Sequence, residues 1–230
     1  MALFALGDLH LSFGVDKSMS VFGDGWHSYT ERLESEFSKL NEDDVCVLCG
    51  DISWGMSFEE SLADFSFLSG LPSKKIILKG NHDYWWSTSS KMREFFNKND
   101  IKNISILHNN CHFYKDIAIC GTRGWMTDHT MTLEQNAKIL NREALRLRAS
   151  LNAAKKDVEK ICFFHYPPRF KDIVNAELIS IMREFGVKKC YYGHIHSQGH
   201  RYAVQGNIDG IFYEMVSADY LGFSPKQVLS

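Results

Sequence analysis

Five short segments, spread from residue 8 to residue 196, carry side chains of the types that bind metal ions. Each segment follows a run of apolar residues and offers carboxylate, imidazole or amide groups. This mixture of oxygen and nitrogen donors suits metal ions that keep coordination positions open for chemistry. The segments are Asp8-Leu9-His10, Gly50-Asp51, Gly80-Asn81-His82-Asp83, His165 and Gly193-His194-Ile195-His196.

The order of the segments is more informative than any one of them. A lone Asp after a strand is usually a turn residue, and a lone His is usually a hydrogen-bonded structural residue. In open α/β sheets, however, ligands bind beyond the carboxyl ends of the strands. Glycines precede four of the segments, at positions where a sharp turn and close backbone approach are needed. We therefore expect the candidate groups to meet at one edge of one sheet.

The apolar pattern predicts the elements that position these groups. Continuous apolar runs predict buried strands at residues 2–6, 45–49, 75–78, 161–164 and 190–192. Helical spacing predicts helices at residues 29–40, 58–71, 91–96, 133–156 and 176–185, and Thr132 with Gln135 predicts a capping box at the longest of them. Alternation of strand and helix in the first half predicts a parallel sheet with helices on both faces.

The middle and the tail of the chain follow a different pattern. Three short β-type runs between residues 104 and 120 predict a meander, and residues 200–217 predict a closing hairpin around Asp209-Gly210. These segments predict a second sheet, or an antiparallel extension, packed against the first. No linker or repeat interrupts the chain, so we expect one α/β domain over residues 1–230.

Composition narrows the classes of protein. The formal net charge is −2, which favours neither nucleic acid nor an anionic membrane as a partner. No apolar run approaches the roughly 20 residues that span a bilayer, and the N-terminus lacks the basic region of a signal peptide. Cys46 and Cys49 would point to opposite faces of a strand, which argues against a redox dithiol. We expect reduced cysteines and a cytoplasmic location.

Taken in order, the five segments form the pattern D-x-H, G-D, G-N-H-D, H and G-H-x-H. With this pattern the sequence resembles the calcineurin-like metallophosphoesterase superfamily, over a span from Asp8 to His196. The resemblance implies a four-layer β-sandwich core flanked by helices, with two divalent metal ions at one end. It assigns Asp8, His10 and His196 to the first metal, Asn81, His165 and His194 to the second, and Asp51 to a bridge between them.

The resemblance also implies a reaction. A hydroxide bridging the two metals would attack a phosphate monoester or diester of a small molecule or nucleotide, without a covalent enzyme intermediate. His82 would contact the phosphate and protonate the leaving oxygen, and Asp83 would orient His82. Manganese or iron is expected first, and zinc or nickel would also fit these ligands.

One departure from the family concerns the phosphate itself. The Ser/Thr protein phosphatase branch carries G-D-x-x-D-R-G, whereas this chain has Gly50-Asp51-Ile52-Ser53-Trp54-Gly55 and therefore lacks that phosphate-binding Arg. Arg123 is the first candidate to replace it and Arg169 the second, because Arg suits bidentate phosphate contact. His112 and His129 are weaker extra candidates, and His27, His108 and His200 have no motif support.

Alternatives remain open at this stage. A nuclease of the same superfamily would use the same metals, but the near-neutral charge disfavours it. A protein-interaction scaffold would retain the fold, but such members typically lose ligands that are all present here. Aromatic residues near the motifs would either stack on a base or pack the loops. They are Trp26, Trp54, Tyr84, Trp85, Trp86, Trp125 and Tyr166. The substrate and the oligomeric state are left open.

Overall fold

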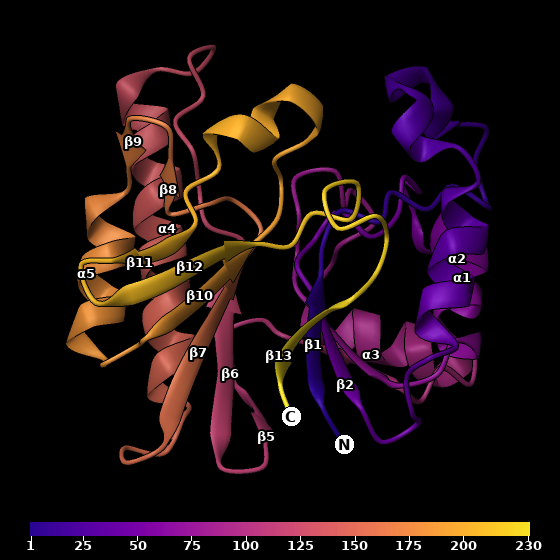
Figure 1. The fold of residues 1–230 in the computed structure, drawn as a ribbon, viewed down its shortest axis with the longest axis horizontal. Coiled ribbons are helices and arrows are strands. Elements are labelled where there is room, and N and C mark those ends of the chain that lie inside the picture. Colours follow the sequence, from indigo (N-terminus) through magenta and orange to yellow (C-terminus); the bar gives the residue numbers. More distant parts are fainter.

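The strands form two facing sheets in a mixed α/β fold (Figure 1). The computed structural model describes residues 1–230 except for the side chain of Phe22. The first sheet has the order β13 (Lys226–Leu229), β1 (Leu3–Leu6), β2 (Val45–Leu48), β3 (Lys74–Ile77) and β4 (Ile104–Ile106). The second has the order β11 (Gly206–Ile208), β12 (Ile211–Met215), β10 (Lys189–Tyr192), β7 (Glu159–Phe164), β6 (Ile117–Thr122) and β5 (His112–Tyr114).

Helices cover the outer face of each sheet and complete four layers (Figure 1). The helices α1 (Tyr29–Phe37), α2 (Phe58–Gly70) and α3 (Ser89–Lys98) pack on the first sheet, and α4 (Leu133–Asn152) and α5 (Ala176–Glu184) on the second. The Thr132 hydroxyl accepts from the Gln135 backbone and the Gln135 side chain accepts from the Thr132 backbone, which confirms the capping box. The expected layered α/β architecture is therefore confirmed.

Burial on both faces explains why the central strands are apolar without alternation. In β1 the side chains of Leu3 and Ala5 face the other sheet, while that of Leu6 faces the helices. In the same way Cys46 packs toward the helices and Cys49 toward the second sheet, as a two-residue side-chain period requires. These two thiols therefore lie on opposite faces of the first sheet.

Two details of the expected topology are wrong. The run at residues 104–106 does not belong to a meander, because β4 pairs parallel with β3 in the first sheet, through a crossover that contains α3. Of the three expected runs, only those of β5 and β6 form a hairpin, which belongs to the second sheet. The candidate site residues accordingly follow strands of both sheets. They share one end of the sandwich rather than one edge of one sheet.

Several short elements surround that end. They are the 3-10 helices η1 (Met19–Phe22), η2 (Asp24–Trp26) and η3 (Ser197–Tyr202), and a small hairpin of β8 (Arg169–Phe170) and β9 (Ile173–Val174). In Figure 1 the η3 segment lies at the top between the two sheets, and the segment of η1 and η2 lies at the upper right. Among the described residues, no helix is both long and apolar enough to cross a membrane.

Candidate metal centre

The loops after five strands bring the candidate ligands together at one end of the sandwich. Asp8 and His10 follow β1, Asp51 follows β2, Asn81 follows β3, His165 follows β7, and His194 and His196 follow β10. The backbone of the first loop is held against the second, since the amide of Asp8 donates to the Gly50 carbonyl (2.9 Å) and that of His10 to the Asp51 carbonyl (2.9 Å). The two loops thus position each other.

These loops adopt unusual backbone conformations. Asp8, His10, Asp51 and His194 have positive φ angles of 61°, 48°, 51° and 73°. Left-handed conformations are uncommon for residues other than glycine and cluster at functional sites, where the surrounding structure enforces them. The conformations turn the four side chains inward from the strand ends.

Two motif glycines are required because other groups approach them closely. A Cβ atom on Gly80 would lie 2.0 Å from the Asp51 carboxylate, and one on Gly193 would lie 2.5 Å from the Asp8 carboxylate. Any side chain at either position would displace a candidate ligand. The two glycines thus leave room for the carboxylates of two candidate ligands.

The first group of ligands matches the set expected for the first metal. One ligand atom each from Asp8, His10 and His196 lies within 4.8 Å of the others. The Nε2 atoms of His10 and His196 are 3.3 Å apart, and His196 Nε2 is 3.8 Å from Asp8 Oδ1. His196 Nδ1 donates to Asp219 (3.0 Å), which directs Nε2 at the group and makes it the nitrogen that carries the lone pair in the neutral ring.

The second group gathers around the Nε2 atom of His165. It lies 2.6 Å from Asn81 Oδ1, 3.2 Å from His194 Nδ1 and 3.6 Å from Asp51 Oδ2. Asp51 Oδ2 is also 3.6 Å from His10 Nε2, so this carboxylate stands between the two groups, where a bridging ligand belongs. The buried Asp8, Asp51 and His165 side chains also form a compact set of possible ligands.

The hydrogen-bond pattern of the second group fits a cation. His165 Nδ1 donates to the Cys49 carbonyl (3.0 Å), so Nε2 carries a lone pair. This lone pair faces the amide oxygen of Asn81, and neither atom has a proton to share. Acceptors that converge on acceptors in a buried site are stabilised by a bound positive ion. Asn81, His165, His194 and Asp51 therefore fit a divalent metal.

Burial sets the ionisation of these groups. It raises the pKa of the Asp8 carboxyl to about 8, against the opposing charge of His196, and it also raises the pKa of Asp51. It holds the pKa values of His10, His165 and His194 well below the usual range. Neutral imidazoles are the form that binds metal, and divalent ions would offset the cost of burying the carboxylates.

Asp219 is a site residue that reasoning from the sequence missed. One carboxylate oxygen accepts from His196 Nδ1, and the other accepts from the Ser197 amide (3.0 Å) and lies 3.2 Å from His200 Nε2. Burial disfavours the charged form of His196, but Asp219 and Asp8 outweigh it and raise the pKa of His196 to about 9. Asp219 thus fixes the orientation and the tautomer of a candidate ligand.

Replacing Asp219 with asparagine is expected to weaken binding of the first metal about 10- to 100-fold, because this is the usual effect of removing a carboxylate that holds a ligating histidine. Metal affinity would be measured by competition with a chelator above pH 9, where His196 has lost the proton that competes with the metal. Asp209→Asn is the matched control, since Asp209 pairs with Arg169 and Arg183 instead. Equal affinities of the two variants would contradict the role of Asp219.

His82 and Asp83 occupy different positions beside the ligands. The His82 amide donates to Asp51 Oδ1 (2.8 Å), and its ring lies with its centroid 5.7 Å from that of His10. The His82 Nδ1 atom is buried without a hydrogen-bond partner. Asp83 is fully buried. In the described structure, none of the hydrogen bonds of its carboxylate involves the His82 ring. Its carboxylate instead accepts from the amides of Asp51, Ile52, Ser53 and Gly80 and from Trp85 Nε1.

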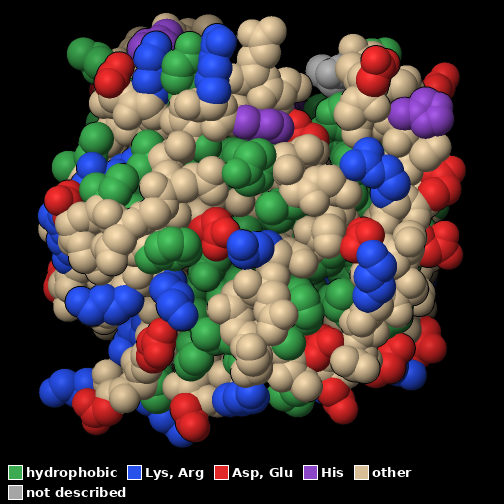
Figure 2. Space-filling view, viewed as in Figure 1, with side chains coloured by type: hydrophobic (Ala, Val, Ile, Leu, Met, Phe, Trp, Pro, Cys, Tyr) green, Lys and Arg blue, Asp and Glu red, His purple; other side chains and the backbone are tan. Residues whose placement is uncertain are grey.

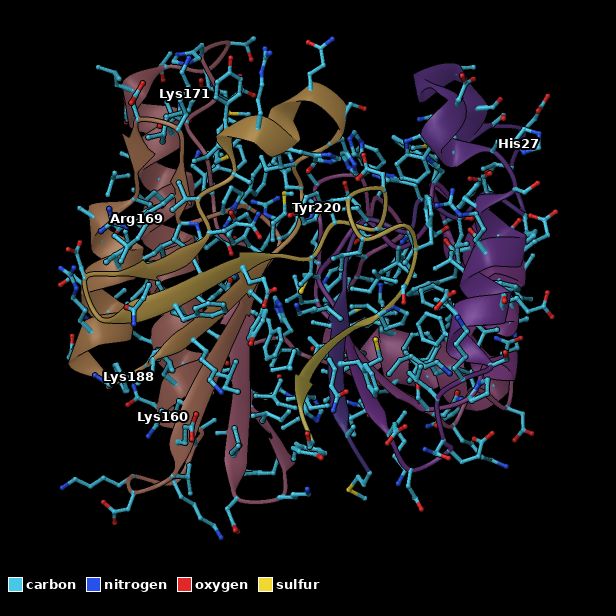
Figure 3. The ribbon with its side chains drawn as sticks, in the orientation of Figure 1. His27, Lys160, Arg169, Lys171, Lys188 and Tyr220 are labelled. Carbon is cyan, nitrogen blue, oxygen red and sulfur yellow. The ribbon has the colours of Figure 1, made fainter. Side chains whose placement is uncertain are left out.

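The two arginines proposed for phosphate contact are both engaged elsewhere. The Arg123 guanidinium lies 3.6 Å from the carboxylate of buried Glu143 and 6.0 Å from the ring centroid of Tyr166. The ring centroids of Tyr166 and His194 are in turn 4.2 Å apart. Arg123 is therefore one side chain away from the ligands. Arg169 pairs with Asp209 (2.8 Å) and lies near α5, away from the centre of the molecule (Figure 3).

The remaining histidines are placed outside the two groups of ligands. His112 bonds the Ile106 carbonyl (2.9 Å), His108 packs edge-on against Trp86, and His129 is exposed. His27 bonds Ser28 on the outer side of the molecule (Figure 3). His200 contacts Asp219 and is the one histidine without motif support that lies beside a ligand's partner.

The family follows from comparison with known sequences. Residues 1–198 match the model of the calcineurin-like phosphoesterase family, and the chain belongs to that family. A search of curated protein sequences gave no match.

Similar solved structures cover nearly the whole chain. A phosphopantetheinyl hydrolase from Mycobacterium tuberculosis has a TM-score of 0.61 at 14% identity, covering 99% of this chain and 95% of the other. A protein of unknown function from Aquifex aeolicus has a TM-score of 0.55 at 13% identity, with 98% and 95% covered. A Thermus thermophilus protein has a TM-score of 0.54 at 15% identity, with 84% and 81% covered. At these identities the likeness concerns the fold.

Proposed function

We propose that this protein is a two-metal phosphohydrolase that cleaves phosphate monoesters or diesters of small molecules or nucleotides. The observation that carries the proposal is the convergence of the candidate ligands. The amide oxygen of Asn81 and ring nitrogens of His165 and His194 face one another, and the Nε2 atoms of His10 and His196 do the same, with Asp51 between the two groups. Membership of a phosphoesterase family supports the same reaction.

Each candidate residue has a distinct role in the proposed reaction. When bound, two divalent ions would generate a nucleophile from water at neutral pH and offset phosphoryl charge. Asp8, His10 and His196 would hold one ion, Asn81, His165 and His194 the other, and Asp51 both. His82 would give a proton to the leaving oxygen. Burial lowers the pKa of His82 and Asp51 opposes this shift, and the negative charge of a bound ester would further favour the protonated ring.

The phosphate contact is proposed for Arg123, and a positioning role for Asp83. Arg123 would have to rotate from Glu143 past Tyr166, whereas the carboxylate of Asp83 already holds the loop that carries Asp51. Arg169 is not proposed, because its guanidinium is paired with Asp209 far from the ligands.

A small substrate is proposed rather than a nucleic acid because of the charge distribution. On the face that Figure 2 shows, Lys and Arg side chains are interspersed with Asp and Glu and form no continuous basic stripe. The formal net charge of −2 agrees. Nucleic-acid binding depends on neutralising phosphates along a groove, which this face does not offer.

Chelation is expected to abolish hydrolysis, and added Mn²⁺, Fe²⁺, Zn²⁺ or Ni²⁺ to restore it to different extents. Activity would be measured on an aryl phosphate monoester, an aryl phosphodiester, a cyclic nucleotide, a phosphopantetheinylated peptide and single-stranded DNA, with bound metal quantified in each sample. Hydrolysis that persists after complete metal removal would contradict the two-metal mechanism. A fully metal-loaded protein without activity on any of these esters would favour a scaffold.

A further inference from the structure

An apolar pocket of about 210 Å³ opens beside the candidate metal centre. Met19, Trp26 and Trp54 form its apolar wall, and each of these side chains is less than a tenth exposed. The remaining lining residues are His10, His82, His196 and Ser197. Because three of these are proposed ligands or the proposed proton donor, the pocket is continuous with the position of the reacting phosphate.

We propose that this pocket, called the Met19 pocket below, seats the leaving group of the ester, and that this group is an apolar alcohol about the size of one aromatic ring. The proposal rests on the proposed phosphohydrolase function and adds to it the chemical class of the substrate. It is carried by three features of the described residues: the place of His82, the apolar character of the wall, and the size of the pocket.

The place of His82 determines which part of the ester enters the Met19 pocket. The His82 ring lies with its centroid 4.4 Å from that of Trp54, on the wall of the pocket. A proton donor must reach the oxygen that it protonates within hydrogen-bond distance. The carbon attached to that leaving oxygen therefore lies on the same side of the phosphorus as Trp54, and the rest of the leaving group extends into the pocket.

The apolar wall determines the chemistry of the leaving group. Apart from its three histidines, the Met19 pocket is lined by no ionisable side chain among the described residues. A sugar or glycerol entering it would lose hydrogen bonds to water without regaining them, whereas an aromatic or branched alkyl group would gain contact with the side chains of Met19, Trp26 and Trp54. The opposite flank of the centre is more polar, since Tyr166 and Arg123 lie there.

The volume sets the size of the leaving group. A dry apolar cavity of about 150 Å³ can hold benzene, and sites for drug-sized ligands usually measure about 300–1,000 Å³. A pocket of about 210 Å³ lies between these values. Its volume therefore suits one ring with its linking carbon.

The wall of the pocket is fixed by its own contacts. The Trp54 ring stacks on the ring of His10, with 4.9 Å between their centroids, and the Lys17 ammonium lies 3.2 Å from the Trp54 ring centroid. Trp54 Nε1 donates a hydrogen bond to Met19 Sδ (3.1 Å). Trp26 packs against Phe223 (5.2 Å) and Tyr29 (5.5 Å). Figure 1 shows that η1 and η2, which carry Met19 and Trp26, face the loop that begins η3 with Ser197. The pocket is therefore preformed between these segments.

The test compares two esters of primary alcohols, benzyl phosphate and glycerol 1-phosphate, with metal-loaded protein. We expect kcat/KM for benzyl phosphate to exceed that for glycerol 1-phosphate by roughly tenfold or more, from burial of the ring. Met19→Gln should lower this ratio about tenfold, because the NH₂ group of its amide has no partner once the ring is bound. Met19→Leu should leave the ratio within about threefold, since it keeps the volume and the apolar wall.

The two variants also distinguish the effect of the apolar wall from the effect of the hydrogen bond that Trp54 donates to residue 19. Glutamine can still accept from Trp54 Nε1 and leucine cannot, so a ratio that falls in Met19→Leu but not in Met19→Gln would overturn the proposal. Equal kcat/KM values for the two esters in the unaltered protein would also overturn it.

A binding measurement keeps the test independent of turnover. If neither ester is hydrolysed, the wider set of esters given above decides about the proposed function, and calorimetry with benzylphosphonate and 2,3-dihydroxypropylphosphonate decides about the pocket alone. Benzylphosphonate bound about tenfold more tightly, with this advantage lost in Met19→Gln, would support the Met19 pocket. Equal affinities for the two phosphonates would overturn it.

Discussion

Replacing His82 with alanine is expected to lower kcat about 10²- to 10⁴-fold while the protein keeps its metal ions. The ring of His82 lines the pocket beside the ligands, its Nδ1 atom has no partner in the described structure, and it is only half-buried. It is thus placed to reach the substrate without serving as a ligand. Steady-state kinetics and metal analysis on the same sample would measure the two quantities.

The size of the loss should depend on the leaving group. A 4-nitrophenyl ester leaves as a stable anion and needs little protonation, so its hydrolysis should suffer least from His82→Ala. Esters of ordinary alcohols should suffer most. A loss that is equal for both classes would indicate that His82 positions the phosphate rather than donating a proton.

A matched control distinguishes the loss of a proton donor from a general disturbance of the protein structure. His27→Ala removes a histidine that bonds Ser28 on the outer surface, and it should leave kcat and metal content unchanged. If His82→Ala instead loses its metals, the division between ligands and proton donor is wrong. In that case His82 would have to be counted among the ligands.

The motif residues could be located from the sequence because each lies within a few residues of the strand that positions it. Asp8 follows Leu6, and His165 follows Phe164, so the local apolar pattern already indicates where these side chains begin. The carboxyl ends of parallel strands share one end of a sheet, which makes the convergence predictable. The assignment of those strands to two sheets was not predictable, because pairing such as that of β10 with β7 joins residues far apart in the chain.

Residues that contact the site but lie far from the motifs in the sequence were missed for the same reason. Asp219 holds His196 across 23 residues, and Lys17 lies over Trp54 across 37. Neither Asp219 nor Lys17 belongs to a recognisable pattern, and a lone Asp or Lys has no distinctive spacing. The orienting role expected of Asp83 toward His82 stays a prediction, and the hydrogen bonds that its carboxylate accepts come from the amides of other loop residues, such as Asp51 and Gly80.

The Asp83→Asn variant is expected to lose about 3 kcal/mol or more of its free energy of unfolding. The Asp83 carboxylate is fully buried and accepts from four backbone amides and from Trp85 Nε1. An asparagine side chain would turn an NH₂ group toward some of these donors and leave them unsatisfied. Each hydrogen bond to a charged group contributes about 1.5–3 kcal/mol, and a buried donor without a partner costs about 1–3 kcal/mol.

Denaturant unfolding of the metal-free protein would measure this loss separately from any effect on metal binding. Asp64→Asn is the matched comparison, because Asp64 is also buried but accepts, among the described residues, only from the Phe13 amide and the Ser53 hydroxyl. Its loss should be smaller, in line with its fewer donors. If Asp83 served only to orient His82, its replacement would lower kcat and leave the free energy of unfolding unchanged. The network places Asp83 at the junction of the Asp51 and Gly80 loops instead, so stability and metal binding should fall together.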